Sequence, residues 1–207
     1  MTEQEWSESA DPWKMLEFLK GRAGDRKSRL FAVSCCRGVR PLLKPKLTRR
    51  VVTIAERYAE GKASGSELRS AFLALRERTE PAAKAARWAA SEDAGEAARL
   101  AREWVRVLVA STRGGEDSPR QADLLRDLIG NPYRPVTLAP SWFVWHDGLL
   151  VSMARRMYES RDFSDMPVLA DALEEAGCQD ADILGHCRSG GEHVRGCWVI
   201  DLLLGKS

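Results

Sequence analysis

Apolar residues recur along this chain at the three- and four-residue intervals that place them on one face of a helix. The clearest stripe comprises Ala94, Ala97, Ala98, Ala101, Trp104, Val105 and Leu108. A second stripe fills the inner side of the segment 48–59 with valine, isoleucine, alanine and tyrosine. Alternating strand-like patterns are limited to the short pieces RPVTL and CWVI. The pattern therefore predicts an all-α protein.

Helix boundaries are indicated by capping residues and glycines. Asp11 before Pro12 is typical of an N-cap followed by proline at the first helical position. Ser64 and Glu67 have the spacing of a capping box. Further N-caps are expected at Thr48, Ser91 and Asp180. These boundaries predict about 9–11 helices arranged as helical hairpins in a multi-helix bundle.

Two segments interrupt the helical pattern. The stretch STRGGEDSP, residues 111–119, combines glycine, serine and charge as linkers do. It predicts an N-terminal helical part, 1–113, and a C-terminal part, 119–207, packed together as one domain. The segment 130–140 contains three prolines. Because proline disfavours helix at the residue before it, we expect an irregular course over 130–147.

Composition and charge narrow the function classes. The 207 residues include 44% hydrophobic and 30% charged residues, which is typical of a globular protein with a buried core. The net charge of +2 argues against a dedicated nucleic-acid binder. One basic cluster could still contact phosphates weakly, although solvated surface charge is the commoner explanation. Its members are Arg37, Arg40, Lys44, Lys46, Arg49 and Arg50.

The ends of the chain bear on localisation. The first residues, MTEQEWSESADPWK, lack the basic and apolar regions of a secretory signal. The apolar run CWVIDLLL is interrupted by Asp201 and is too short to cross a bilayer. Five cysteines cannot all pair within one chain, and we expect them to be thiols in a reducing compartment. These features predict a cytoplasmic protein without membrane contact.

The stretch HCRSGGEHVRGCW, residues 186–198, concentrates histidine and cysteine. The last helix is predicted over HVRGCWVIDLLLG, so that His193 and Cys197 share one of its faces, whereas the adjacent His186 and Cys187 diverge on the short helix before it. Zinc takes four ligands of these types, and Cys35 or Cys36 could complete the set from a packed helix. The spacing lacks a C-x-x-C pair, and buried thiols that simply fill the core are the alternative. The sequence leaves open whether the cofactor is zinc or none.

Catalytic constellations are incomplete. A cysteine nucleophile needs a base within hydrogen-bond reach, which His193 could offer to Cys197, with His146 as an outside partner. The deaminase, HExxH and Walker patterns do not occur in the sequence. A metal- or cysteine-dependent hydrolase using the residues of 186–197 is therefore a second hypothesis.

An aromatic group follows the proline-rich segment. Trp142 and Trp145 lie with Phe143 and His146 in SWFVWHDG. Such a group forms either a recognition patch for a partner protein or part of the hydrophobic core where an irregular segment crosses it.

Several phrases resemble an uncharacterised, heavily paralogous family of bacterial helical domains. They are MLEFLKGRAGDRKSRLFAVSCCR, LLRDLIGNPYRP, LADALEEAGC, DILGHCR and HVRGCWVIDLLLGK. The resemblance spans nearly the whole chain, and the WFVWHDGLL portion departs from it. It implies a regulatory or recognition module and brings no activity, cofactor or catalytic residue.

Together these observations favour a non-enzymatic helical module that binds another protein, with a structural zinc ion as an option. The metal- or cysteine-dependent hydrolase and a weak nucleic-acid binder acting through residues 37–50 are the alternatives.

Overall fold

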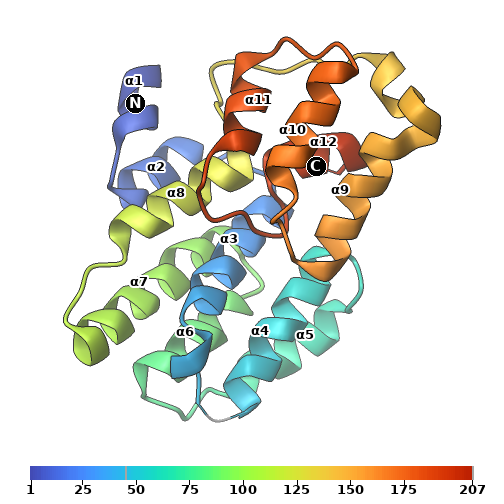
Figure 1. Ribbon diagram of the computed structural model, residues 1–207. Coiled ribbons are helices and arrows are strands. Elements are labelled where there is room, and N and C mark those ends of the chain that lie inside the picture. The colour runs from blue at the N-terminus through green and yellow to red at the C-terminus, as the bar shows by residue number, and fades with distance from the viewer. Residues whose placement is uncertain (45, 207) are drawn as a thin grey trace. The chain divides into compact units, whose positions relative to one another are not determined.

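The structure is a computed structural model that describes residues 1–44 and 46–206, with only the backbone of Arg113. Twelve α-helices and three short 3₁₀ helices, without any strand, make up the regular structure of these residues (Figure 1). The predicted all-α class is confirmed. The chain divides into two units, Met1 with Glu8–Leu125 and Thr2–Ser7 with Arg126–Ser207.

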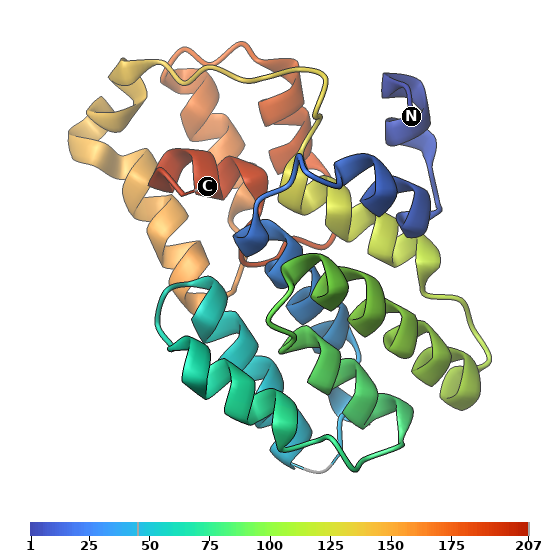
Figure 2. The same ribbon diagram turned by 180° about the vertical axis from the view of Figure 1, so that it is seen from behind.

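The first unit contains α2 to α7 and the beginning of α8. Their bounds are α2 Pro12–Leu19, α3 Asp25–Gly38, η1 Arg40–Leu42, α4 Lys46–Ala59, α5 Gly65–Leu73, α6 Pro81–Ala89, α7 Ala94–Arg113 and α8 Ser118–Ile129. Helices α3, α6 and α7 pack against one another, and α6 and α7 lie side by side in Figure 2. The small side chains of Ala86, Ala97 and Ala101 are fully buried there, which lets the helix axes approach closely.

A buried arginine completes this core. Arg29 on α3 donates hydrogen bonds to the carbonyl oxygens of Ala89 and Ser91 at 3.2 and 2.5 Å. Ala89 is the last residue of α6, where a helix leaves its last acceptors without intrahelical donors, and Ser91 follows just after it. The guanidinium group therefore caps α6 from a neighbouring helix.

The predicted caps are confirmed where the signal is local. Asp11 accepts from the amide of Trp13, Ser64 and Glu67 form the capping box, and Asp180 caps α11. Two predicted caps are wrong. Thr48 is buried inside α4, which begins two residues earlier. Asp93 caps α7 in place of Ser91, since its carboxylate accepts from the amide of Glu96.

The second unit contains α1 and the helices that follow α8. Their bounds are α1 Glu3–Glu8, η2 Pro140–Phe143, η3 Trp145–Gly148, α9 Leu149–Ser160, α10 Met166–Glu175, α11 Ala181–Arg188 and α12 Trp198–Leu204. Helix α12 packs against α9, as Figure 2 shows from behind. The segment between α8 and η2 lacks helix, as the prolines predict. The indole of Trp6 on α1 donates to the Gly130 carbonyl at 3.0 Å.

The predicted course of the last helix is wrong. Residues 189–197 form no helix, and α12 begins only at Trp198. Gly196 has a φ of +98°, which a helix excludes, and the amide of Val194 is bonded to a side chain of α8. His193 and Cys197 therefore do not share a helical face.

The predicted linker is shorter than its composition indicates. Helix α7 continues to Arg113 and α8 starts at Ser118, so only 114–117 connect them. The boundary between the two units lies further on, inside α8. Among the described residues, no helix combines the length and apolar character that crossing a membrane requires.

Candidate metal centre

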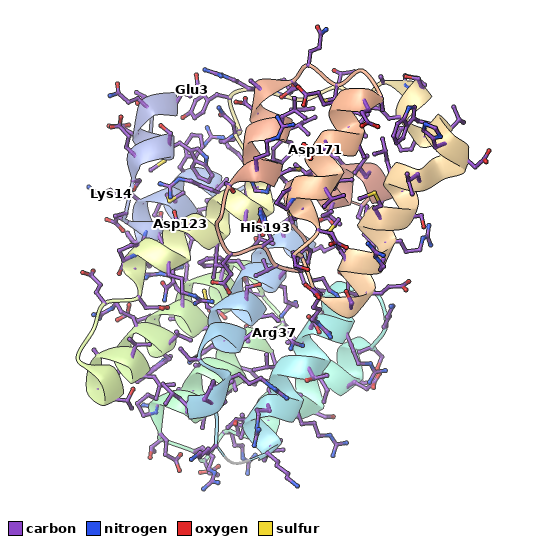
Figure 3. All side chains as sticks on the ribbon, in the orientation of Figure 1. Glu3, Lys14, Arg37, Asp123, Asp171 and His193 are labelled. Carbon is purple, nitrogen blue, oxygen red and sulfur yellow. The ribbon has the colours of Figure 1, made fainter. Side chains whose placement is uncertain are left out.

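Four side chains that can bind a metal ion converge within the second unit. Asp127 comes from the last turn of α8, His186 from α11, His193 from the loop 189–197, and Cys197 directly precedes α12. Each offers one ligand atom, and these four atoms lie within 4.8 Å of one another. Figure 3 labels His193, which lies beside α8.

The separations suit a small ion. His186 Nε2 lies 3.2 Å from Cys197 Sγ and 3.3 Å from Asp127 Oδ1. Tetrahedral zinc with normal bond lengths would hold such ligand atoms about 3.3–3.6 Å apart. His193 Nδ1 is closer to Asp127 Oδ1, at 2.7 Å, which is a hydrogen-bond distance. An ion would replace that hydrogen bond and widen the pair.

The cluster is almost closed to solvent. The side chains of Asp127 and His193 are 4% and 7% exposed, and Cys197 is fully buried. His186 is the most accessible member at 16%. A site with four protein ligands and little solvent access is typical of structural rather than catalytic zinc.

Asp127 organises the loop that carries two of the other residues. Its Oδ1 faces both histidines, while its Oδ2 accepts from the amide of Val194 at 2.9 Å. Burial opposes ionisation of this carboxyl group, but hydrogen bonds from His186 and His193 outweigh burial and lower its pKa. The buried carboxylate therefore fixes both imidazoles and the backbone beside them.

His193 has an incomplete set of partners. Its Nδ1 is bonded to Asp127, whereas its Nε2 is buried and has no hydrogen-bond partner among the described residues. Buried polar atoms are nearly always partnered in folded proteins. The His193 ring is therefore fixed through Nδ1 alone among the described residues.

The types of ligand atom in this group favour some metal ions over others. Two imidazoles, one thiol and one carboxylate are ligands that zinc accepts, whereas magnesium and calcium prefer oxygen alone. Burial, reinforced by the charge of Asp127, raises the pKa of Cys197 well above its ordinary value. The metal-free thiol is therefore protonated and inaccessible, which disfavours a nucleophilic role, whereas a bound ion would displace its proton.

Three of the six predicted ligand candidates belong to this group, namely His186, His193 and Cys197. Cys187 is buried beside them but is not a member, and burial raises its pKa to about 12. Cys35 and Cys36 are buried on α3 of the first unit, and the four-residue group does not include them.

Asp127 is the member that sequence reasoning missed. It lies far upstream of the histidine-rich stretch, among 30 acidic residues. One signal could have found it: Leu124, Leu125 and Leu128 are its buried neighbours on α8. A carboxylate on the apolar side of an amphipathic helix needs a partner, because burial of an unpaired charge is costly.

The remaining predicted residues lie elsewhere. Arg37 forms an ion pair with Glu56 at 2.6 Å, Arg40 lies in η1, and the other basic residues surround the start of α4. Trp142 is buried in the core and Trp145 is partly buried. His146 contacts the Trp145 ring and does not belong to the four-residue group. Nucleic-acid binding and partner binding through these residues stay predictions.

The chain matches no model of a known protein family, no curated protein and no solved structure. The resemblance to a paralogous bacterial family therefore stays a prediction, and the function must be argued from the residues themselves.

Proposed function

We propose that this chain is a non-catalytic helical module whose second unit is held together by a structural zinc ion. The ligands are Asp127, His186, His193 and Cys197. The observation that carries the proposal is the convergence of these four ligand atoms within 4.8 Å.

The positions of the ligands support a structural role. Three of them lie within residues 186–197, at the end of α11, in the loop and just before α12, and the fourth is on α8. One ion would therefore join three helices to a loop that lacks secondary structure of its own. Since such a site does not form in an unfolded chain, metal binding contributes directly to folding.

Hydrogen bonds also attach the loop to neighbouring elements. Arg195 donates to the carbonyl oxygen of Tyr158 at 2.9 Å, and Val194 donates to Asp127. Helix α12 begins directly after the loop and buries Val199, Ile200 and Leu203. The ion would thus also fix the start of α12 against its core.

Metal content of the purified full-length protein tests the proposal. We expect about one zinc per chain after exhaustive dialysis, and less than a tenth of that in Cys197→Ser and His186→Ala. Cys178→Ser is the matched control, because Cys178 is also buried in the second unit but lies outside the group. Wild-type protein that takes up no zinc when refolded with it would refute the proposal, as would Cys197→Ser protein with wild-type zinc content.

A further inference from the structure

The hairpin of α4 and α5 in the first unit carries an apolar groove of about 390 Å³. The apolar side chains that line it are Leu47, Val51, Ile54, Ala71 and Ala74. Grooves of this size accept small molecules or the apolar face of a helix. Leu47 is 38% exposed at the rim, Val51 and Ala71 are buried at the floor, Ile54 is partly buried and Ala74 is exposed.

Uncompensated positive charge lies at one end of this groove. Lys44, Lys46, Arg49 and Arg50 surround the start of α4, and Arg50 itself lines the groove. Within the described part of the chain, none of these four side chains forms an ion pair. The positive end of the α4 dipole adds to their charge.

The opposite end of the groove is electrically balanced. Glu67 near the start of α5 lines it and lies 3.6 Å from Arg57 in the last turn of α4. The groove is therefore positive at one end only, and an elongated ligand with charge at one end would bind in a single direction.

We propose that this groove binds an amphipathic helix of a partner protein, with acidic residues of that helix facing Arg50, which lines the groove, and Lys46, which lies one turn earlier on the same side of α4. The distance along α4 from Leu47 to Ile54 is about 10 Å, or two helical turns. That length accommodates apolar anchors at positions i, i+3 or i+4, and i+7 of the partner. The basic residues would set the direction and the specificity of docking.

A nucleic acid is the competing ligand for the same cations. Phosphates would use the four basic side chains but would leave the apolar floor uncovered. The combination of an apolar floor and an exposed Leu47 favours a peptide. A substitution that fills the groove should weaken peptide binding but not nucleic-acid binding.

A displayed library of amphipathic helical peptides tests the proposal on the full-length protein. Leucine is fixed at i, i+3, i+4 and i+7, and the other positions are randomised. We expect enriched peptides to carry acidic residues at one end. The best of them, labelled with fluorescein, is then titrated by anisotropy beside a labelled single-stranded oligonucleotide.

Three variants distinguish peptide binding in the groove from nucleic-acid binding by the basic residues. Ser70→Trp fills the groove from an exposed position on α5, and Arg50→Glu reverses one rim charge. We expect each to weaken peptide binding at least about tenfold. Arg155→Glu, an exposed cation on α9 that does not line the groove, is the charge-matched control and should leave affinity within about twofold.

Library enrichment without acidic residues would overturn the proposal, as would no enrichment or peptide binding unaffected by Ser70→Trp. Oligonucleotide binding that weakens in Arg50→Glu, without peptide binding, would instead assign the basic residues to nucleic acid. Circular dichroism of the variants verifies that they fold. Metal content is measured on the same samples, so that a failure of peptide binding can be distinguished from a failure of the proposed zinc site.

Discussion

Replacement of Asp127 tests the role of the buried carboxylate at the centre of the cluster. Alanine at this position removes the acceptor of His193 Nδ1 and of the Val194 amide, which lie 2.7 and 2.9 Å from the carboxylate oxygens. Each donor left unsatisfied in a buried position costs about 1–3 kcal/mol. We therefore expect Asp127→Ala to lower the free energy of unfolding by about 2–6 kcal/mol in metal-free protein.

The Asp127→Asn variant separates the effect of the carboxylate's charge from the effect of its shape. Asp127→Asn keeps an acceptor oxygen near both donors but loses the charge that strengthens their hydrogen bonds. Since hydrogen bonds to charged groups are about 1 kcal/mol stronger than neutral ones, the expected loss is about 1–2 kcal/mol. The order of stability should be wild type, asparagine, alanine.

Urea denaturation in the presence of a chelator measures these differences, followed by circular dichroism and tryptophan fluorescence. Trp198 reports on the site, because its ring centroid lies 5.3 Å from that of His186. Glu175→Ala is the control, since Glu175 is exposed on α10 of the same unit and its replacement should cost less than about 0.5 kcal/mol. An Asp127→Ala variant as stable as this control would show that the buried carboxylate does not stabilise the second unit.

Zinc added to the same samples separates binding from folding. A ligand at about a thousand times its dissociation constant stabilises the native state by about 4 kcal/mol. Wild-type protein should show this gain, and Asp127→Ala should lose most of it. A full gain in the alanine variant would show that Asp127 is not a ligand.

Three further predictions concern the same unit and the thiols. The pKa of Asp127 is lowered below its reference of 3.8, so the carboxylate stabilises the folded protein above that value, and this stabilisation is lost as the pH falls through the folded pKa. In urea titrations at different pH, the greater stability of metal-free wild type over Asp127→Asn should vanish at that low pH. Gly130→Ala should lower stability by about 1–3 kcal/mol, measured by urea denaturation, because φ is +73° and the new Cβ would lie 2.9 Å from the Trp198 ring; an unchanged midpoint would contradict this geometry. All five cysteines are buried, so a thiol reagent such as DTNB should modify native protein only on the time scale of unfolding, and fast modification would disprove their burial.

Local signals explain what the sequence could predict. The caps at Asp11, Ser64 and Asp180 depend on residues within three positions of one another, and all three are present in the structure. The all-α class likewise follows from periodic apolar positions on each helix. These features depend on short-range chemistry that a single sequence contains.

The metal cluster was predictable only in part, because its geometry depends on tertiary contacts. His186, His193 and Cys197 were identified from residue type, but the reason for their proximity was wrong. They meet through an irregular loop, which Gly196 and the bond from Val194 to Asp127 keep out of a helix. The contribution of Asp127 depends on how α8 packs, which no local pattern records.

The boundary between the two units is also a feature that local sequence patterns do not predict. Composition indicates a break at 111–119, yet the two units divide inside α8, whose residues form one continuous helix. Contacts between distant segments decide where one core ends, and a helix can serve two cores without any change in local composition. Trp142 also illustrates this, since its place in the core depends on the packing of η2 against α9.

X-ray absorption at the zinc edge of zinc-loaded, full-length protein measures the proposed ligand set itself. We expect a four-coordinate ion with a single sulfur neighbour at about 2.3 Å and nitrogen or oxygen neighbours at about 2.0–2.1 Å. The sulfur signal should disappear in Cys197→Ser. A six-coordinate ion without sulfur, or a sulfur neighbour that persists in Cys197→Ser, would contradict the proposed ligand set.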